Sequence, residues 1–366
     1  KAYGPRRGEE GETAHRRTGS WRAQVVVEKA RRWLREGRDA RPVVLCLNLM
    51  DPHHPYEPDH PDAFAWRAAK TSERRALYDA RLVSTGRDPI HDDEFHTLER
   101  LQAAYDAEIL QVDQGLGELF DYLESSGLMQ SSIVVLTSDH GEGLWQRPSG
   151  DGWVNTRRHE NQILPELYRG HGEQLYEELL HVPLVFHGPG VPAGRRDARP
   201  TSLIDVLPTL FSLLDLSPPE GLQGHALFQD PDSSGHDALF STCSRGTTIT
   251  QDGRWKLHLP NAVILARGAR PVLFDLESDP LEETPIEDPA REAQLSSKIT
   301  AWLALHRRDA EELPIEEQRR LILQMGYIGL AADLHKDMSK EEIQRLFKLE
   351  REQRKAEAAA ATRSED

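Results

Sequence analysis

Positions 21 to 214 alternate between stretches with helical spacing and short continuous apolar runs. Helices are predicted at 21–36, 93–125, 202–214 and, shorter, near 173–180, and the clearest is 93–125, where apolar residues recur every three or four positions. The apolar runs at 43–49, 132–138 and 182–187 are typical of strands buried on both faces. This alternation favours an α/β fold with a mostly parallel sheet flanked by helices, in which the three runs are parallel neighbours.

The pattern changes after about residue 236. Short strand candidates, separated by Asp-Gly and Arg-Gly turns, lie at 239–244, 247–251, 254–259 and 271–276, and a helix is predicted at about 289–308. This order predicts a small antiparallel α+β subdomain. We therefore divide the chain into an α/β part at 1–235, the subdomain at 236–312, and terminal helices with a charged tail at 313–366.

Composition narrows the range of partners. The chain has 366 residues, of which 61 are acidic and 45 basic, and its formal net charge is −16. This balance argues against nucleic acid as the main partner, because phosphate backbones require a basic surface. No apolar run approaches the roughly 18 residues of a membrane span. Two cysteines exclude a disulfide framework and a cysteine-based zinc site, and a first residue other than Met indicates a piece of a longer chain.

Residues that can bind metals or anions lie in three loops at strand ends. Asp139 and His140 follow the run at 132–138, His53 follows the run at 43–49, and His171 lies between two glycines. An ordinary strand-to-loop turn explains Asp-His-Gly alone about equally well. Because a parallel sheet brings such ends together, a metal-competent pair with two further imidazoles points to a tetrahedral oxyanion such as sulfate or phosphate. The stretch at 145–169 is predicted to be an irregular loop.

The order of the motifs from about residue 20 to 330 resembles the sulfatase family of the alkaline-phosphatase superfamily. The matching segments are NLMDPHHPY at 48–56, VVLTSDHGE at 134–142, HGEQLYEE at 171–178, DVLPTL at 205–210, DGRWKL at 252–257, LFDLESDP at 273–280 and QMGYIG at 324–329. Each motif is modest evidence by itself, whereas their joint order is highly specific.

The resemblance implies roles for four residues. Asp139 and His140 match half of a divalent-metal site, with calcium the first expectation and magnesium or manganese the alternatives. His53 matches the histidine that contacts the sulfate and protonates the leaving group, and His171 stands where many members have a sulfate-binding lysine. The family's two early metal-binding aspartates and its Cys/Ser-x-Pro-x-Arg nucleophile, which becomes formylglycine, have no counterpart in the printed sequence.

The resemblance thus implies a metal-dependent sulfuric ester hydrolase that acts on a small-molecule or glycan sulfate ester. Because the nucleophile motif is missing, the chain alone is expected to be inactive. Two alternatives remain open: a phosphate or phosphonate ester hydrolase on the same scaffold, and a non-catalytic interaction module.

Overall fold

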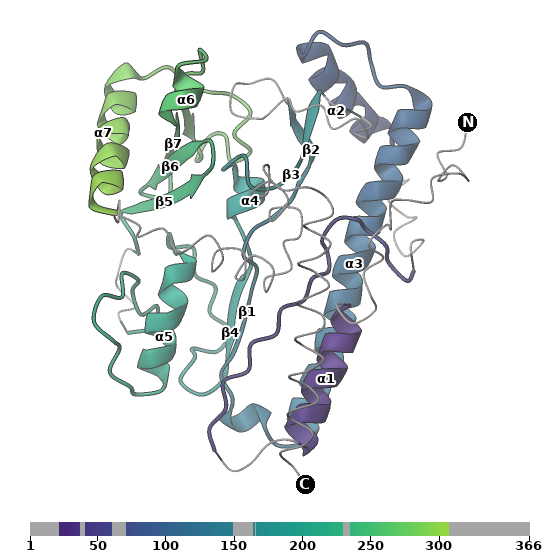
Figure 1. Cartoon of the computed structure of the whole chain (residues 1–366), viewed down its shortest axis with the longest axis vertical. Coiled ribbons are helices and arrows are strands. Elements are labelled where there is room, and N and C mark those ends of the chain that lie inside the picture. Colours follow the sequence, from purple (N-terminus) through teal and green to yellow (C-terminus); the bar gives the residue numbers. More distant parts are fainter. Residues whose placement is uncertain are drawn as a thin grey trace, which may run out of the picture. The chain divides into compact units, whose positions relative to one another are not determined.

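The computed structural model describes residues 22–36, 41–60, 71–148, 164, 166–229 and 235–306. The chain divides into two compact units, Lys1–Ile299 and Thr300–Asp366. The predicted segment 313–366 lies outside the described residues, and the predicted division at 235 and 312 stays a prediction. All described strands, and all described helices before the last, belong to the first unit (Figure 1).

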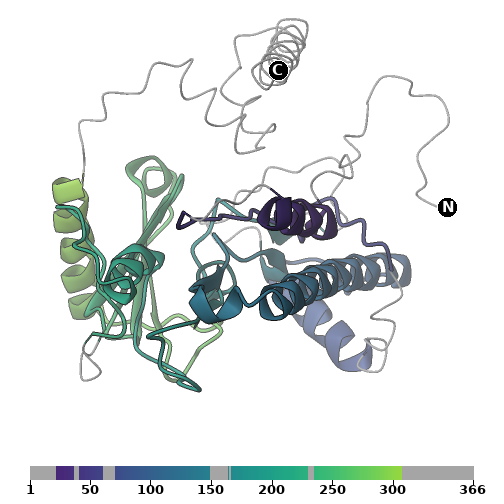
Figure 2. The same ribbon diagram turned by 90° about the horizontal axis from the view of Figure 1, so that it is seen from below.

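Helices α1 (Ala23–Glu36) and α3 (Asp92–Ser125) correspond to the predicted helices at 21–36 and 93–125. A capping box of His91 and Glu94 begins α3, and the three acidic residues of its first turn lie at the positive end of the helix dipole. Val27 of α1 packs against Leu119 and Leu123 of α3 in a buried cluster. Figure 2 shows the two helices lying side by side.

The expectation that the runs at 132–138 and 182–187 form parallel neighbours is wrong. Strands β1 (Val134–Thr137) and β4 (Leu184–His187) pair antiparallel, with Val134 opposite His187 and Thr137 opposite Leu184. In an antiparallel pair the chain leaves β1 and enters β4 at the same end, whereas a parallel pair would require a crossover to the opposite end. The hydroxyl of Thr137 donates to the carbonyl of Pro183 across that end, at 2.8 Å.

The apolar run at 43–49 does not form a strand in the structure, which contradicts the prediction. Its side chains are also more exposed than predicted. Val44 is 98% exposed and Leu45 is 43% exposed, although both were expected in a core. An apolar run forms a strand only where a neighbour accepts its backbone hydrogen bonds, and among the described residues no strand pairs with this segment.

The stretch at 145–169, expected as an irregular loop, begins and ends in a hairpin. Strands β2 (Gly143–Pro148) and β3 (Leu167–Gly170) pair antiparallel across it. Trp145, only 1% exposed, anchors the hairpin in a cluster that includes Phe95 of α3 and Leu82 of helix α2 (Thr71–Ser84). The hairpin escaped prediction because its residues do not alternate regularly, and Trp145 itself has a positive φ of 63°.

A four-stranded antiparallel sheet follows, in the order β5-β6-β7-β8. Its strands, which correspond to the four predicted short strands, are β5 (Ala238–Cys243), β6 (Gly246–Gln251), β7 (Trp255–Pro260) and β8 (Val272–Asp275). Asp252 and Gly253 both have positive φ, and the N–H of Arg254 donates to the carbonyl of Gln251, so the Asp-Gly pair forms the predicted turn between β6 and β7.

The remaining helices are short, apart from the last. They are α4 (Glu177–Leu180), α5 (Val206–Leu213) after a 3₁₀ turn at Leu203–Asp205, α6 (Ala262–Leu265), a 3₁₀ turn at Met129–Ser131, and α7 (Pro289–His306). Helix α4 follows the predicted site residue His171 closely in the sequence.

Candidate functional site

Three histidine rings that are far apart in the sequence lie together in the structure. The rings of His140 and His171 stack with their centroids 4.0 Å apart and an interplanar angle of 27°. The ring of His53 meets that of His171 edge-on, with a centroid separation of 5.4 Å. His171 thus contacts both of the other rings, and we call His53, His140 and His171 the histidine cluster.

Asp139 and His140 lie in the turn that leaves strand β1. The backbone N–H of His140 donates to Oδ1 of Asp139 at 3.0 Å, and Oδ2 of Asp139 lies 3.6 Å from Nε2 of His140. The Asp139 side chain is 72% exposed, whereas that of His140 is 31% exposed. The hydroxyl of Ser138 donates to the His140 carbonyl at 2.7 Å and stabilises the turn. The predicted pair is therefore adjacent, with its carboxylate open to solvent.

Gly141 allows this turn to approach helix α4 closely. Its N–H donates to the carbonyl of Leu179 at 2.9 Å. A Cβ at this position would lie only 2.0 Å from the carbonyl oxygen of Glu178, a backbone atom that cannot rotate away. Close approach, not an unusual φ, is what requires glycine between His140 and Glu142.

A Gly141→Ala substitution should therefore displace either the turn or helix α4, at a cost of about 1–3 kcal/mol in the free energy of unfolding. Gly117→Ala is the matched control, because a Cβ there meets nothing within 4 Å on an exposed face of α3. Alanine stabilises a helix by roughly 1 kcal/mol relative to glycine, so the control should be neutral or stabilising. Chemical denaturation measures both; equal stability of the two variants would contradict the close packing of Gly141.

His53 lies in the loop at 51–60, which buried side chains fasten to the helices. Asp51, 6% exposed, accepts a hydrogen bond from the N–H of Ala23 at the start of α1. Glu108 of α3, 1% exposed, accepts from the N–H of Glu57 at 2.7 Å. The two carboxylates therefore hold the loop at both ends and set the position of His53.

Glu142 is a site residue that the sequence analysis missed. Its Oε2 lies 3.2 Å from Nδ1 of His171, and its side chain is 6% exposed. The only signal was its place in the strand-end motif, two residues after His140. The motif gave no indication that this carboxylate turns inward while that of Asp139 stays exposed.

The Nδ1 atom of each ring in the cluster faces an oxygen acceptor. These acceptors are the carbonyl of His54 for His53 and that of Gly141 for His140, each at 2.7 Å, and the Glu142 carboxylate for His171. Because carbonyl and carboxylate oxygens only accept, Nδ1 carries the hydrogen in each contact. In the neutral rings Nε2 then holds the lone pair, through which an imidazole takes up a proton or binds a metal.

A buried tyrosine, Tyr56, and a half-buried one, Tyr105, feel the charge of the same carboxylate. Burial raises the pKa of Tyr56, and the charge of Glu142 raises it further. Burial, again with Glu142, raises the pKa of Tyr105 to about 12. Their rings meet edge-on at 5.4 Å, and within the described residues the Tyr56 hydroxyl has no hydrogen-bond partner. Both phenols therefore stay neutral near pH 7 and cannot serve as bases there.

The donor set for a metal is incomplete in the part of the chain that the structure describes. No group of three or more His, Cys, Asp or Glu side chains is placed there to hold an ion. Calcium takes roughly six to eight oxygen ligands and magnesium requires near-octahedral geometry. One carboxylate from Asp139 and one imidazole from His140 do not fit either requirement by themselves.

Comparison with known proteins decides the family. The sulfatase family model matches residues 9–216, more than half of the chain. The chain belongs to the sulfatase family. Among curated relatives, arylsulfatase K of the mouse is 26% identical over 296 residues, which covers 71% of this chain and 49% of the relative. The chain thus spans about half the length of the curated relatives it matches.

Solved structures show the same fold. A phosphonate monoester hydrolase of Agrobacterium radiobacter has a TM-score of 0.53 and 23% identity, over 77% of this chain and 60% of the other. A protein solved in complex with its substrate D-glucosamine-2-N,6-O-disulfate also has a TM-score of 0.53, with 16% identity, over 79% of this chain and 71% of the other. Such likenesses support the alkaline-phosphatase-like fold that the motifs implied. Within the described ranges, no helix has the length and apolar character needed to cross a bilayer.

Proposed function

We propose that this sulfatase-family chain forms part of a hydrolase for sulfuric esters, with the histidine cluster at its reaction site. The observation that carries the proposal is the contact of His171 with both His140 and His53. Three loops that are distant in sequence bring imidazoles together, and Nδ1 of each ring is hydrogen-bonded to an oxygen acceptor. This arrangement suits a tetrahedral oxyanion, because protonated imidazoles donate hydrogen bonds to it and stabilise its charge.

Each predicted residue has a role in this proposal. His53 gives the proton at its Nε2 to the leaving oxygen, while His171 donates to a sulfate oxygen. Glu142 orients His171 through the contact of its Oε2 with Nδ1. The ester would be a small-molecule or glycan sulfate, and the structural likeness to a protein solved with a disulfated glucosamine supports the second choice.

Asp139 and His140 would supply two of the ligands of a divalent metal, with calcium the first candidate. The described residues supply no third ligand, so further ligands have to come from elsewhere in the protein. When bound, such an ion polarises the sulfate and stabilises the charge that develops on it. The formylglycine nucleophile of the family belongs to a motif that the printed sequence does not contain.

The test is a comparison of substrates with the intact protein. We expect kcat/KM for an aryl sulfate to exceed that for the matching aryl phosphate and for a phenylphosphonate monoester. A preference for phosphonate would favour the alternative that the likeness to the Agrobacterium enzyme suggests. Binding of sulfate esters without hydrolysis of any of the three would instead favour a non-catalytic interaction module.

A further inference from the structure

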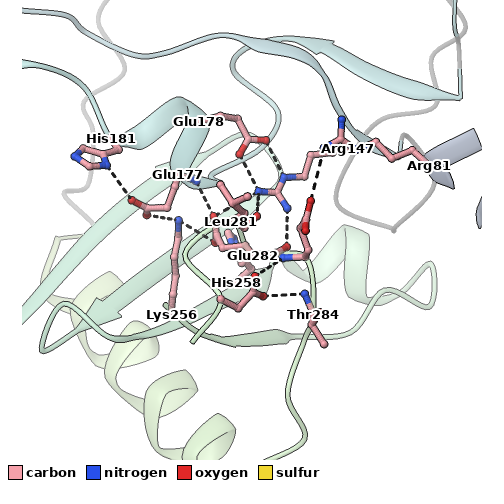
Figure 3. Close-up of polar contacts among 12 residues, drawn as sticks. Arg81, Arg147, Glu177, Glu178, His181, Lys256, His258, Leu281, Glu282 and Thr284 are labelled. Atoms are coloured by element: carbon pink, nitrogen blue, oxygen red, sulfur yellow. Dashed lines mark hydrogen bonds and ion pairs between the residues drawn. The ribbon is translucent and has the colours of Figure 1, made fainter. Parts of the chain in front are cut away.

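A largely buried network of charged residues holds helix α4, which contacts the turn of His140 through Gly141. It consists of Arg147 on β2, Glu177 and Glu178 on α4, Lys256 and His258 on β7, and Glu282 after β8. Figure 3 shows these side chains converging around Glu282. The network therefore joins the four-stranded sheet to the helix that follows His171.

Glu282 is the centre of this network. Its side chain is fully buried, and its Oε1 accepts from Nζ of Lys256 at 3.0 Å and from Nε2 of His258 at 2.9 Å. Its Oε2 accepts from the backbone N–H of Glu177 at 2.7 Å. Its carbonyl accepts from Arg147 at 2.6 Å. The positive φ of Glu282, 52°, shows that the backbone tolerates an unfavourable conformation to place this carboxylate.

Lys256 connects the sheet to helix α4. Its side chain is completely buried, and Nζ contacts Glu282 at 3.0 Å and Oε1 of Glu177 at 2.7 Å. On the other side of α4, Arg147 forms a bidentate pair with Glu178, at 2.8 and 2.9 Å. The first two residues of α4 are therefore both held by buried or nearly buried cations.

Helix α4 in turn holds the turn of the site. The Leu179 carbonyl accepts the N–H of Gly141, and the Glu178 carbonyl occupies the space where a Cβ of residue 141 would lie. Gly141 lies between His140 and Glu142, so any shift of α4 shifts both side chains. A continuous chain of contacts thus runs from Lys256 through Glu177 and Leu179 to the turn that carries His140.

We propose that Lys256 is a positioning residue for the site, which holds the turn of His140 and Glu142 through helix α4. In this proposal the four-stranded sheet that carries Lys256 helps to position the site. This inference deepens the proposed function and, for its activity measurement, rests on it. Misplacement of a reacting group by about 1 Å costs on the order of 10²-fold in rate, so a small shift of α4 is enough to matter.

The experiment compares three variants of the intact protein. Lys256→Met removes the ammonium, and Glu177→Gln removes the charge of its partner on α4, at a side chain that is 30% exposed, so the second variant folds even if the first does not. Arg254→Met is the matched control. Arg254 forms a bidentate pair with Asp275 in the same sheet, at 2.9 and 2.7 Å, and no contact with α4 is recorded for it.

The direct measurement is hydrogen exchange of the Gly141 amide, followed by mass spectrometry well below each unfolding temperature. We expect faster exchange in Lys256→Met and Glu177→Gln than in the wild type, and wild-type exchange in Arg254→Met. The kcat/KM for an aryl sulfate should fall by about 10- to 10²-fold in the first two variants and stay near the wild-type value in the control.

Unchanged exchange at Gly141 in the variants that fold would overturn the inference, whatever their activity. Faster exchange with undiminished hydrolysis would also overturn it, because the turn would then be held without effect on the reaction. If the wild-type protein hydrolyses no sulfate ester, the proposed function fails. The exchange measurement still decides in that case whether Lys256 holds the turn.

Discussion

Replacing His53 by alanine should lower kcat/KM of the intact protein for a sulfate ester by about 10²- to 10⁴-fold, the usual contribution of a positioned general acid. The contact between its Nδ1 and the His54 carbonyl fixes the ring, so that Nε2 is the atom proposed to protonate the leaving oxygen. The loss should depend on the leaving group. A nitrophenolate leaves without protonation, so 4-nitrophenyl sulfate should lose less rate than an alkyl sulfate.

His54→Ala is the matched control for this prediction. His54 is exposed, and its ring lies against Tyr56 with a centroid separation of 5.6 Å. Its substitution should cost far less activity than that of His53. Equal losses in the two variants would remove His53 from the site, and an equal loss for both leaving groups would show that His53 does not act as the acid.

Periodicity predicted those parts of the fold whose stability comes from local sequence. Helix α3 is an example, since its apolar spacing, its acidic first turn and Gly127 beyond its end are all written in one continuous segment. Motif position likewise singled out His53, His140 and His171, and the structure brings their rings together, although no strand precedes His53 in the part of the chain that the structure describes. Whether these residues carry the proposed roles stays a prediction.

The direction and pairing of strands could not be obtained in this way. An apolar run has the same pattern in a parallel and an antiparallel strand, so nothing in Val134–Thr137 signals that Leu184–His187 returns beside it in the opposite direction. The run at 43–49 fails for a related reason, because burial of a strand depends on neighbours that its own residues do not specify.

The burial of the carboxylates of Glu142 and Glu282 could not be predicted from the sequence either. Glu142 and Glu282 look like ordinary charged residues, which are usually exposed. Each is buried because cations or imidazoles from distant segments meet it, as Lys256 and His258 meet Glu282. Such pairing depends on the finished fold and leaves no periodic trace in the sequence.

The second large effect concerns acid stability. Glu282→Gln should lower the free energy of unfolding at pH 7 by about 3–5 kcal/mol, because removal of one partner leaves buried charges uncompensated. Burial alone would raise the pKa of Glu282, but the hydrogen bond from His258 and the charge of Lys256 outweigh it and hold the pKa at about 2. The carboxylate therefore stabilises the fold at every pH above its unfolded value, near 4.5.

The pH dependence follows from the sign of each shift. Because the folded pKa of Glu282 is depressed, its stabilisation is complete above pH 4.5 and is lost as the pH falls toward 2. Burial also lowers the pKa of His258 below 6.5, despite its bond to Glu282. Below pH 6.5 the unfolded chain takes up a proton on this histidine more readily than the folded protein does, so the free energy of unfolding begins to fall there. Each extra proton taken up on unfolding changes stability by about 1.4 kcal/mol per pH unit.

Two variants separate these contributions in denaturation curves measured from pH 8 to pH 3. In His258→Gln the decrease of the free energy of unfolding that starts below pH 6.5 should become smaller. The steeper decrease below pH 4.5 should remain. The free energy of unfolding of Glu282→Gln should approach that of the wild type below pH 4.5, because the wild-type carboxylate becomes protonated on unfolding there. A constant difference between Glu282→Gln and the wild type over the whole range would show that the pKa of this carboxyl is the same in the folded and the unfolded protein. The cations around Glu282 would then give no net stabilisation to its ionised form, and the ionic link from Lys256 to helix α4 would rest on Glu177 alone.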